Sequence, residues 1–412
     1  MSTLPRPRIL MRARKSSTAV SVRALGSLPI KTSWPLGKQQ MRYVSIKPKV
    51  PQKHRVRSTS SGEKKTIPAP PLAPLQSLNA LKLARRLAGN RPREDRVPQT
   101  GGSTIGESRG RNGERILQLP HVIYPGDTNI IELEDGRVMS FAMFGRLDPK
   151  REMIPMVLEA GTPGTRLVYQ AFHEWGWNNF VPLICPDRPG MGYSTYVKSY
   201  TVVSHAQDVR ALMRALGYRK YQILGTSGGG PFALAVAALA PKSEVLATGI
   251  LVGAAPIEAS RRGQKPGRWW REFVLTVFPW WAEMRLKARI SRKWPNLQRD
   301  AVLLQGLQTK TREVRKVLVE LEKWLRNGIK GYVQDWRAGN SYWGFELEAL
   351  REKGPIHMVY GTKDKNTPLA GGRYMQDRIG LTCTLKEIPG ADHYTAQEIG
   401  GWELRERLRK YK

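Results

Sequence analysis

Residues Tyr221–Phe232 read Tyr-Gln-Ile-Leu-Gly-Thr-Ser-Gly-Gly-Gly-Pro-Phe, and this stretch decides the fold. An apolar, strand-like run ends at Gly225, and an Ala-rich run typical of a helix follows from Pro231. Ser227 therefore lies on a very tight turn, where Gly225 and Gly229 leave room for the backbone on either side. A turn of this kind between strand and helix holds a serine hydroxyl out as a nucleophile.

The bare Gly-x-Ser-x-Gly pattern is weak evidence in a chain with 39 glycines among 412 residues, so its surroundings matter. Strand-like and helix-like runs alternate on both sides of it. Such alternation predicts an α/β fold with a mostly parallel sheet covered by helices on both faces. The expected strands are 130–133, 138–144, 156–159, 182–185, 221–224, 247–252, 356–360 and 382–388. The expected helices are 167–180, 204–216, 231–240, 374–379 and 396–409.

The alternation stops between residues 257 and 345. This stretch holds eight of the twelve tryptophans and no clear strand, so we expect a helical cap inserted over the carboxyl end of the sheet. The predicted organisation is a basic leader or tail (1–62), a Pro/Gly/Arg-rich linker (63–120), the first half of the core (121–256), the cap (257–345) and the second half of the core (346–412).

The formal net charge of +34 is concentrated near the N-terminus. Residues 1–62 carry 14 Lys and Arg, no Asp or Glu, and many serines. This composition is typical of an organelle transit peptide and favours a mitochondrial location. The alternative is a disordered basic tail on a cytoplasmic protein, binding nucleic acid or anionic lipid without sequence specificity. Neither interpretation predicts a specific nucleic-acid partner.

Residues 78–88 carry apolar side chains at helical spacing with arginines between them. One interpretation is a short basic amphipathic helix on a membrane surface, which would make the protein a peripheral membrane protein. The other is a marginal helix of no consequence. The two cysteines, Cys185 and Cys383, form no disulfide framework and no zinc pattern, and we expect neither a metal nor a cofactor.

A serine hydroxyl needs a base within hydrogen-bond reach, and the base needs an acid that holds its tautomer. Of the six histidines, His393 follows the last expected strand, at the sheet edge where a catalytic base belongs. Asp364, just after the strand 356–360, is the expected acid, and Glu258 is its rival. The order along the chain is then Ser, Asp, His.

The tetrahedral intermediate of acyl transfer needs backbone N–H groups that point at its oxyanion. Gly228, the residue after the serine, is one candidate, because it lies at a helix N-terminus whose dipole favours negative charge. The second donor is expected from the loop 160–164, with Thr162 preferred and Gly161 as the alternative. A plain Pro/Gly turn would contain the same residues.

From about residue 132 to the C-terminus the chain resembles the α/β-hydrolase family. The motifs appear in the family's order: Asp135-Gly136-Arg137, Gly161-Thr162-Pro163-Gly164, Pro186-Asp187-Arg188-Pro189-Gly190-Met191-Gly192-Tyr193-Ser194, the turn at Ser227, Gly361-x-x-Asp364 and Gly390-Ala391-Asp392-His393. The resemblance implies an eight-stranded sheet, a helical cap after the sixth strand and a Ser–His–Asp triad. One departure is Ala160, where the family often has a histidine that supports the oxyanion loop.

The resemblance implies an esterase-, lipase- or aminopeptidase-like serine hydrolase, acting on an ester, amide or thioester through an acyl-enzyme. Serine at the nucleophile position argues against epoxide hydrolases and haloalkane dehalogenases, which use aspartate there. The tryptophan-rich cap suggests a small-molecule substrate with an apolar acyl group. Two alternatives are an acyltransferase on the same fold and a non-catalytic, hydrolase-like module tethered by its basic arm.

Overall fold

The computed structural model describes residues 106–148, 150–259, 267–307 and 310–412. The predicted leader or tail (1–62) and the amphipathic segment 78–88 lie outside these residues. Among the helices within them, none combines the length and the apolar character needed to cross a membrane.

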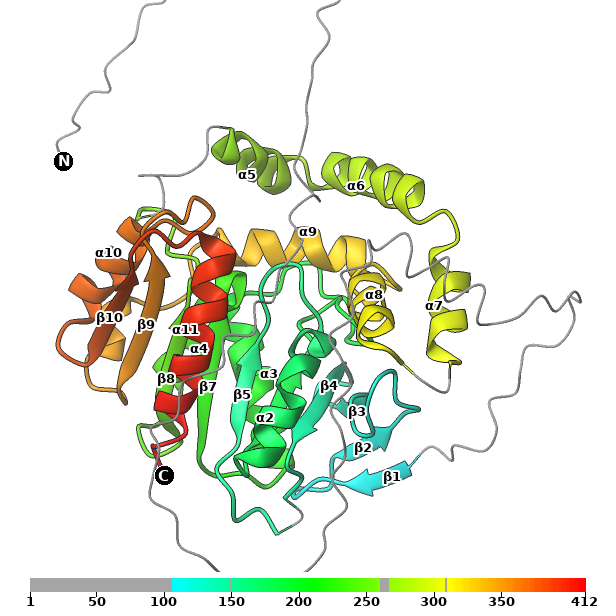
Figure 1. The fold of residues 1–412 in the computed structure, drawn as a ribbon, viewed down its shortest axis with the longest axis horizontal. Helices are drawn as coiled ribbons and strands as arrows, with labels where there is room; N and C mark the ends of the chain where they lie inside the picture. The colour runs from blue at the N-terminus through cyan, green and yellow to red at the C-terminus, as the bar shows by residue number, and fades with distance from the viewer. Residues whose placement is uncertain (1–105, 149, 260–266, 308–309) are drawn as a thin grey trace, which may run out of the picture. The chain divides into compact units, whose positions relative to one another are not determined.

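A ten-stranded mixed sheet forms the centre of the described chain (Figure 1). Its strands are β1 (Gly106–Arg109), β2 (Arg115–Gln118), β3 (Asn129–Glu132), β4 (Val138–Gly145), β5 (Met156–Glu159), β6 (Pro182–Pro186), β7 (Tyr221–Thr226), β8 (Val245–Leu251), β9 (Ile356–Gly361) and β10 (Cys383–Ile388). They lie in the order β1-β2-β3-β4-β6-β5-β7-β8-β9-β10. The pairs from β1 to β6 are antiparallel, and the pairs from β6 to β10 are parallel.

The sheet has two strands more than the expected eight. β1 and β2 form a hairpin within the range predicted as linker, so that prediction is wrong for residues 106–118. Both strands are four residues long and show no alternation of apolar side chains, which is why their sequence gives no strand signal. Pairing with β3 brings the hairpin into the sheet. The other eight strands match the expectation, and β8 is the sixth of them.

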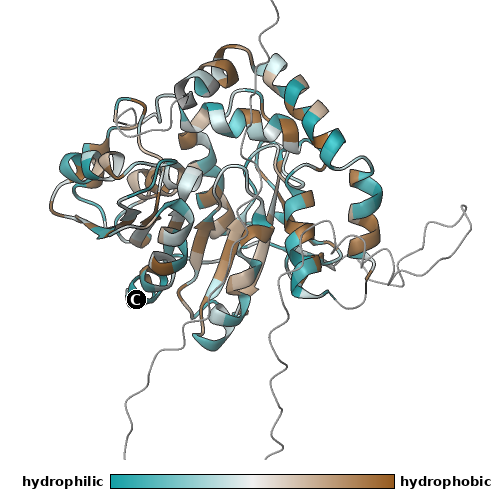
Figure 2. Ribbon diagram, turned by 45° about the horizontal axis from the view of Figure 1, so that its top comes forward, coloured by the Kyte–Doolittle hydropathy of each residue, from teal (hydrophilic) through white to brown (hydrophobic). Residues whose placement is uncertain are grey.

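Helices cover both faces of the sheet. They are η1 (Arg166–Phe172), α2 (His173–Asn178), α3 (Val202–Ala215), η2 (Ser227–Gly229), α4 (Gly230–Leu239), η3 (Leu347–Leu350), α10 (Leu369–Ile379) and α11 (His393–Leu408). α3, α4 and α10 pack on one face, whereas α2 and α11 pack on the other (Figure 1). Neighbouring strand residues such as Ile223 and Leu224 point to opposite faces, so the central strands are apolar throughout (Figure 2).

The stretch between β8 and β9 is a helical cap, as predicted. It contains α5 (Arg268–Val277), α6 (Pro279–Lys293), α7 (Leu297–Gln305), α8 (Arg312–Glu322) and α9 (Gly328–Gly339). No strand interrupts the cap within residues 267–307 and 310–345. In Figure 1, α9 crosses above the sheet, and α5 and α6 lie farther out and pack against it.

His357 lies inside β9 and serves the fold. Its Nδ1 is 2.8 Å from Thr384 Oγ1 and its Nε2 is 2.8 Å from Tyr411 Oη. Burial, assisted by the nearby Arg407 charge, lowers the pKa of His357 from 6.5 to about 4. The folded protein therefore keeps this ring neutral in a pH range where the unfolded chain already binds a proton.

We expect this histidine to make the fold less stable in acid. As pH falls through 6.5 towards 4, the unfolded state takes up a proton that the folded state refuses, so stability falls. Between about pH 7 and about pH 5 we expect His357 to lower the free energy of unfolding by about 1 kcal/mol. This is less than the lowered pKa alone would give, because solvent screening reduces the effect. Urea unfolding at both pH values measures it. A His357→Gln variant with the same pH dependence as the native protein would show that another group is responsible.

Candidate active site

Ser227 lies at the sharp turn between β7 and α4. Its φ of +53° is in the left-handed region, which a residue other than glycine rarely adopts. Gly225 and Gly229, on either side of Ser227, are required because there is no room for a side chain at these positions. A Cβ at Gly225 would lie 2.6 Å from the Gly229 carbonyl oxygen, and one at Gly229 would lie 2.3 Å from the Glu159 carbonyl oxygen. The turn therefore presents the serine from a strained backbone that its neighbours hold in place.

The structure brings the three residues predicted from the sequence together. Ser227 Oγ lies 3.1 Å from His393 Nε2, and His393 Nδ1 lies 2.6 Å from Asp364 Oδ2. Asp364 and His393 are only 4% and 7% exposed, whereas Ser227 is partly accessible. The arrangement is a hydrogen-bonded relay that runs from a buried carboxylate, through an imidazole, to a hydroxyl that solvent can reach.

Asp364 is held as a carboxylate by its loop. It accepts hydrogen bonds from the backbone N–H groups of Asn366 and Thr367, at 2.7 and 3.0 Å. Burial raises the pKa of Asp364, but the hydrogen bonds from His393 and Thr367 outweigh burial, and the net pKa lies below its ordinary value. The rival acid, Glu258, is exposed on the turn after β8.

Thr367 is a member of this group that the sequence reasoning missed. Its hydroxyl lies 2.9 Å from Asp364 Oδ2 and 3.1 Å from His393 Nδ1, and it is also 2.9 Å from the Val252 carbonyl oxygen. It therefore fixes the carboxylate and the imidazole to the end of β8. The available signal was its place three residues after Asp364, where a threonine commonly bonds back to an aspartate.

The predicted oxyanion residues lie beside the serine. A Cβ at Gly228 would lie 3.0 Å from the Thr162 backbone nitrogen, so these two backbone segments approach closely. A Cβ at Gly161 would lie 3.3 Å from Ser227 Cβ. Within the described residues the Thr162 N–H has no hydrogen-bond acceptor. Thr162 and Gly228 therefore offer a pair of adjacent backbone donors for an anionic oxygen.

A buried arginine supports this loop where the family often uses histidine. Arg188 Nη1 donates to the Ala160 carbonyl oxygen at 2.7 Å, and Nη2 donates to the Gly161 carbonyl oxygen at 3.3 Å. Its Nε and Nη2 also donate to the two carboxylate oxygens of Asp335, at 2.5 and 2.9 Å. Arg188 is 1% exposed, and two carboxylates balance its buried charge: Asp335 and Glu159, whose Oε2 lies 3.3 Å from Arg188 Nη1.

Asp335 belongs to the cap helix α9, and it ties the cap to the loop. Besides Arg188, it accepts hydrogen bonds from Thr162 Oγ1 at 2.6 Å and Tyr200 Oη at 2.7 Å. A second tie joins Glu322 of α8 to Arg166, at 3.0 Å. The two contacts differ in the segment that they bind. Asp335 binds the loop that carries Thr162, whereas Glu322 binds Arg166.

Asp187 has a structural role in the core. Its carboxylate accepts from Arg166 Nη1 at 3.0 Å and from Ser140 Oγ at 2.6 Å, deep in the core. Asp392, beside His393 in sequence, caps α11 and accepts from the backbone N–H groups of Tyr394 and Thr395. Neither aspartate contacts the serine hydroxyl through the hydrogen bonds of the described residues.

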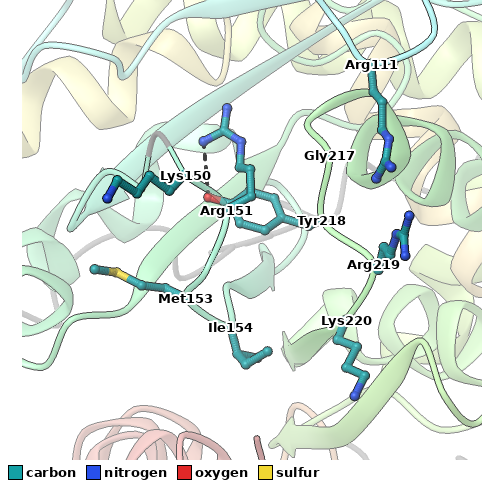
Figure 3. Close-up of a pocket in the computed structure, with 9 residues that line it drawn as sticks. All are labelled: Arg111, Lys150, Arg151, Met153, Ile154, Gly217, Tyr218, Arg219 and Lys220. Carbon is teal, nitrogen blue, oxygen red and sulfur yellow. Dashed lines mark hydrogen bonds between the residues drawn. The ribbon is translucent and has the colours of Figure 1, made fainter.

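A separate hollow of about 620 Å³ lies at the opposite ends of the strands, beside the loops that precede β5 and β7 (Figure 3). Its lining includes five cations, Arg111, Lys150, Arg151, Arg219 and Lys220, and Arg151 donates to Tyr218 Oη at 3.3 Å. The lining contains no carboxylate, serine, cysteine or histidine. It therefore lacks a serine or cysteine nucleophile and a histidine or carboxylate base.

The described residues also contain no group of three His, Cys, Asp or Glu side chains arranged to hold a metal ion. Cys185 and Cys383 are both buried and unpaired by disulfide. Burial raises the pKa of the Cys383 thiol to about 12, so this sulfur stays protonated and inert.

Comparison with known proteins agrees with this architecture. A family model described as the alpha/beta hydrolase fold matches residues 180–396. Similar solved structures include the esterase RhEst1 from Rhodococcus sp. ECU1013, which is 18% identical, with 69% of this chain and 100% of that chain covered and a TM-score of 0.50. Another is MGS-M2, an alpha/beta hydrolase enzyme from a Medee basin deep-sea metagenome library, at 18% identity, 68% and 95% coverage and a TM-score of 0.49.

A third similar structure is the epoxide hydrolase CorEH, at 22% identity, 69% and 97% coverage and a TM-score of 0.49. Curated protein sequences give no significant match. The identities to solved structures are low, so these likenesses concern the fold. The family model covers more than half of the chain and includes the turn at Ser227, Asp364 and His393. The chain therefore belongs to the alpha/beta hydrolase fold family.

Proposed function

We propose that the protein is a serine hydrolase that cleaves a carboxylic ester by way of an acyl-enzyme. The observation that carries the proposal is the continuous relay from Ser227 Oγ through His393 to Asp364, with spacings of 3.1 and 2.6 Å. These are the distances at which a general base accepts a proton from a nucleophile and an acid holds the base. Family membership supports a hydrolase, and the relay supports serine as its nucleophile.

In the first half-reaction Ser227 Oγ attacks the carbonyl carbon of the substrate, and its proton passes to His393 Nε2. The Nδ1–H···Oδ2 hydrogen bond to Asp364 keeps Nε2 free to accept that proton and stabilises the imidazolium that forms. The carbonyl oxygen becomes an oxyanion beside the N–H groups of Gly228 and Thr162. Collapse breaks the ester bond, and His393 gives its proton to the leaving alcohol.

In the second half-reaction water replaces the alcohol. His393 removes a proton from water as its oxygen attacks the acyl carbon, and the same backbone donors bind the second oxyanion. Collapse releases the carboxylic acid and returns the proton to Ser227. No metal or cofactor takes part in this sequence. An amide or a thioester would follow the same steps with a different leaving group.

The substrate we propose is a small acyl ester, and the cap's tryptophan content does not by itself define its acyl group. Trp294, Trp324 and Trp343 are buried and pack the cap against its surroundings. Trp280 and Trp281 are exposed. These five tryptophans are therefore either buried in packing or exposed on the surface. The proposed apolar acyl group must be tested with a series of substrates.

The test combines covalent labelling with turnover. A fluorophosphonate probe is expected to modify the native protein once, at Ser227, as seen by intact mass and peptide mapping. A series of p-nitrophenyl esters of increasing acyl length should then be hydrolysed, with the rate rising towards apolar chains if the acyl proposal holds. Labelling at a different residue would contradict the proposal by placing the nucleophile elsewhere, and no labelling would favour a non-catalytic module. Ester products in place of acid, when a competing alcohol is added, would identify an acyltransferase.

We propose that residues 1–62 direct the protein to mitochondria. The acid-free, Arg- and Ser-rich composition supports this, because a positive segment responds to the potential across the inner membrane. A fluorescent reporter fused behind residues 1–62 should co-localise with a mitochondrial stain. A reporter that stays in the cytoplasm would favour the alternative of a basic tail.

A further inference from the structure

The outer surface of the cap exposes an unusual number of large apolar side chains. They are Trp270, Phe273, Val277, Phe278, Trp280, Trp281 and Met284, each between 38% and 66% exposed. We call these seven residues, which lie on α5, on α6 and at Phe278 between them, the cap patch. No other stretch of similar length in the described chain exposes as many large apolar side chains. Clustered exposure of this kind marks a surface that binds something, whereas single exposed apolar residues do not.

The cap patch is the outer side of two helices whose inner sides are already used. Leu275 of α5 and Ala282 of α6 are buried with Val333 of α9 in a small apolar core. Part of the patch is continuous: the rings of Trp270 and Phe273 stack at 5.4 Å, and those of Phe273 and Phe278 meet edge-on at 6.2 Å. Packing within the cap therefore buries one side of α5 and one side of α6, and it leaves an aromatic surface exposed on the other side.

Basic side chains continue this surface along α6. Arg285, Lys287, Arg292 and Lys293 are all exposed. Arg285 lies over the Trp281 ring, with its guanidinium carbon 5.1 Å from the ring centroid. The two helices together contain seven Arg and Lys and two Glu. An aromatic area bordered by cations complements an anionic surface.

We propose that the cap patch docks the protein onto an anionic lipid membrane. Tryptophan prefers the interface between headgroups and acyl chains, and neighbouring Lys and Arg gain attraction from anionic headgroups. A protein partner would favour depletion of lysine from the contact surface, whereas here the exposed Lys287 and Lys293 of α6 border the aromatic residues. Because α5 and α6 belong to the cap over the carboxyl ends of the parallel strands, docking turns the edge that carries Ser227 towards the lipid (Figure 1).

Binding to vesicles tests the docking surface without reference to catalysis. The full chain is mixed with vesicles of phosphatidylcholine alone or with added phosphatidylglycerol, and bound protein is measured by sedimentation at low and high salt. A variant with Trp280→Ser, Trp281→Ser and Met284→Ser removes apolar area on α6 and keeps residues 1–62 unchanged. At high salt, where the basic leader is screened, we expect its partition into anionic vesicles to fall about tenfold or more.

The matched control is Trp402→Ser, which removes a tryptophan of similar exposure from α11. It should bind vesicles like the native protein. Equal thermal unfolding midpoints for all three proteins exclude a folding defect, and loss of quenching by brominated lipid in the triple variant would place the removed tryptophans in the bilayer. Equal binding by the triple variant and the native protein overturns the proposal. Equal binding of the native protein to both vesicle types at low salt overturns the anionic preference.

Discussion

Replacing Ser227 with alanine is expected to abolish fluorophosphonate labelling and to lower ester turnover by a factor of about 10⁴ or more. The change removes the only oxygen within reach of His393 Nε2 among the hydrogen bonds of the described residues. Substrate binding and the backbone donors of Gly228 and Thr162 are retained, so a low residual rate should remain. The measurement is the rate with the best p-nitrophenyl ester, together with the intact mass after labelling.

The control for this variant is Ser291→Ala, because Ser291 is an exposed serine on α6 far along the chain from the relay. It should label and turn over like the native protein. Thermal unfolding of Ser227→Ala should stay close to native, since the hydroxyl makes one hydrogen bond at the end of β7. Labelling that persists after the alanine replacement would place the nucleophile elsewhere and end the assignment.

Replacing Asp335 with alanine is expected to have the largest effect outside the relay. It removes the bidentate carboxylate of the Arg188 guanidinium, which is 1% exposed and keeps only the Glu159 carboxylate at 3.3 Å, and it removes the acceptor of Thr162 Oγ1. Removing one partner of such a buried pair costs about 3–5 kcal/mol. The folded fraction should also turn over about 10²-fold more slowly, because Arg188 and Thr162 together hold the loop that supplies an oxyanion donor.

The second cap tie separates a specific effect on the loop from a general loss of stability. Glu322 is as buried as Asp335, at 1% exposure, and pairs with Arg166. The Arg166 side chain hydrogen-bonds Asp127, Thr128, Asp187 and Glu322 and lies over the Tyr193 ring, and none of these belongs to the loop 160–164. Glu322→Ala should therefore lower the free energy of unfolding while kcat per folded molecule, from active-site titration, changes little.

Two results would contradict the role assigned to Asp335. One is a native kcat per folded molecule in Asp335→Ala, and the other is an equal loss of kcat in Glu322→Ala. An Asp335→Asn variant keeps the shape and one acceptor oxygen, and it should recover part of the lost rate. If Asp335 had only a structural role, Asp335→Asn would recover the free energy of unfolding and leave kcat per folded molecule unchanged from Asp335→Ala.

Much of the fold was predictable because its signals are local. The apolar runs that form β5, β7 and β9 are located to within a few residues, since buried parallel strands are apolar throughout. α8 shows the corresponding helical signal, with Val314, Val317, Leu318 and Leu321 buried on one side. β1 and β2 were missed, because four-residue edge strands without alternating apolar residues depend on the neighbour with which they pair.

The candidate site also combines features that local sequence encodes with features that depend on distant contacts. The turn that strains Ser227 is encoded by the glycines around it, and the loops that carry Asp364 and His393 follow recognisable strands, so all three were predictable. The supporting contacts were not. Arg188 and Asp335 are 147 residues apart, and Thr367 gains its role only because His393 folds back beside it.

By itself, the sequence determined the succession of strands and helices, the positions of the tight turns and the residue types available at each strand end. Hydrophobic period and backbone sterics act over a few residues, so a linear reading captures them. Only the tertiary structure decided which acid meets the histidine, that an arginine supports the loop 160–164, and that the outer aromatic residues of the cap are exposed. These depend on contacts between distant segments, where burial determines the energy of each charge and each apolar surface.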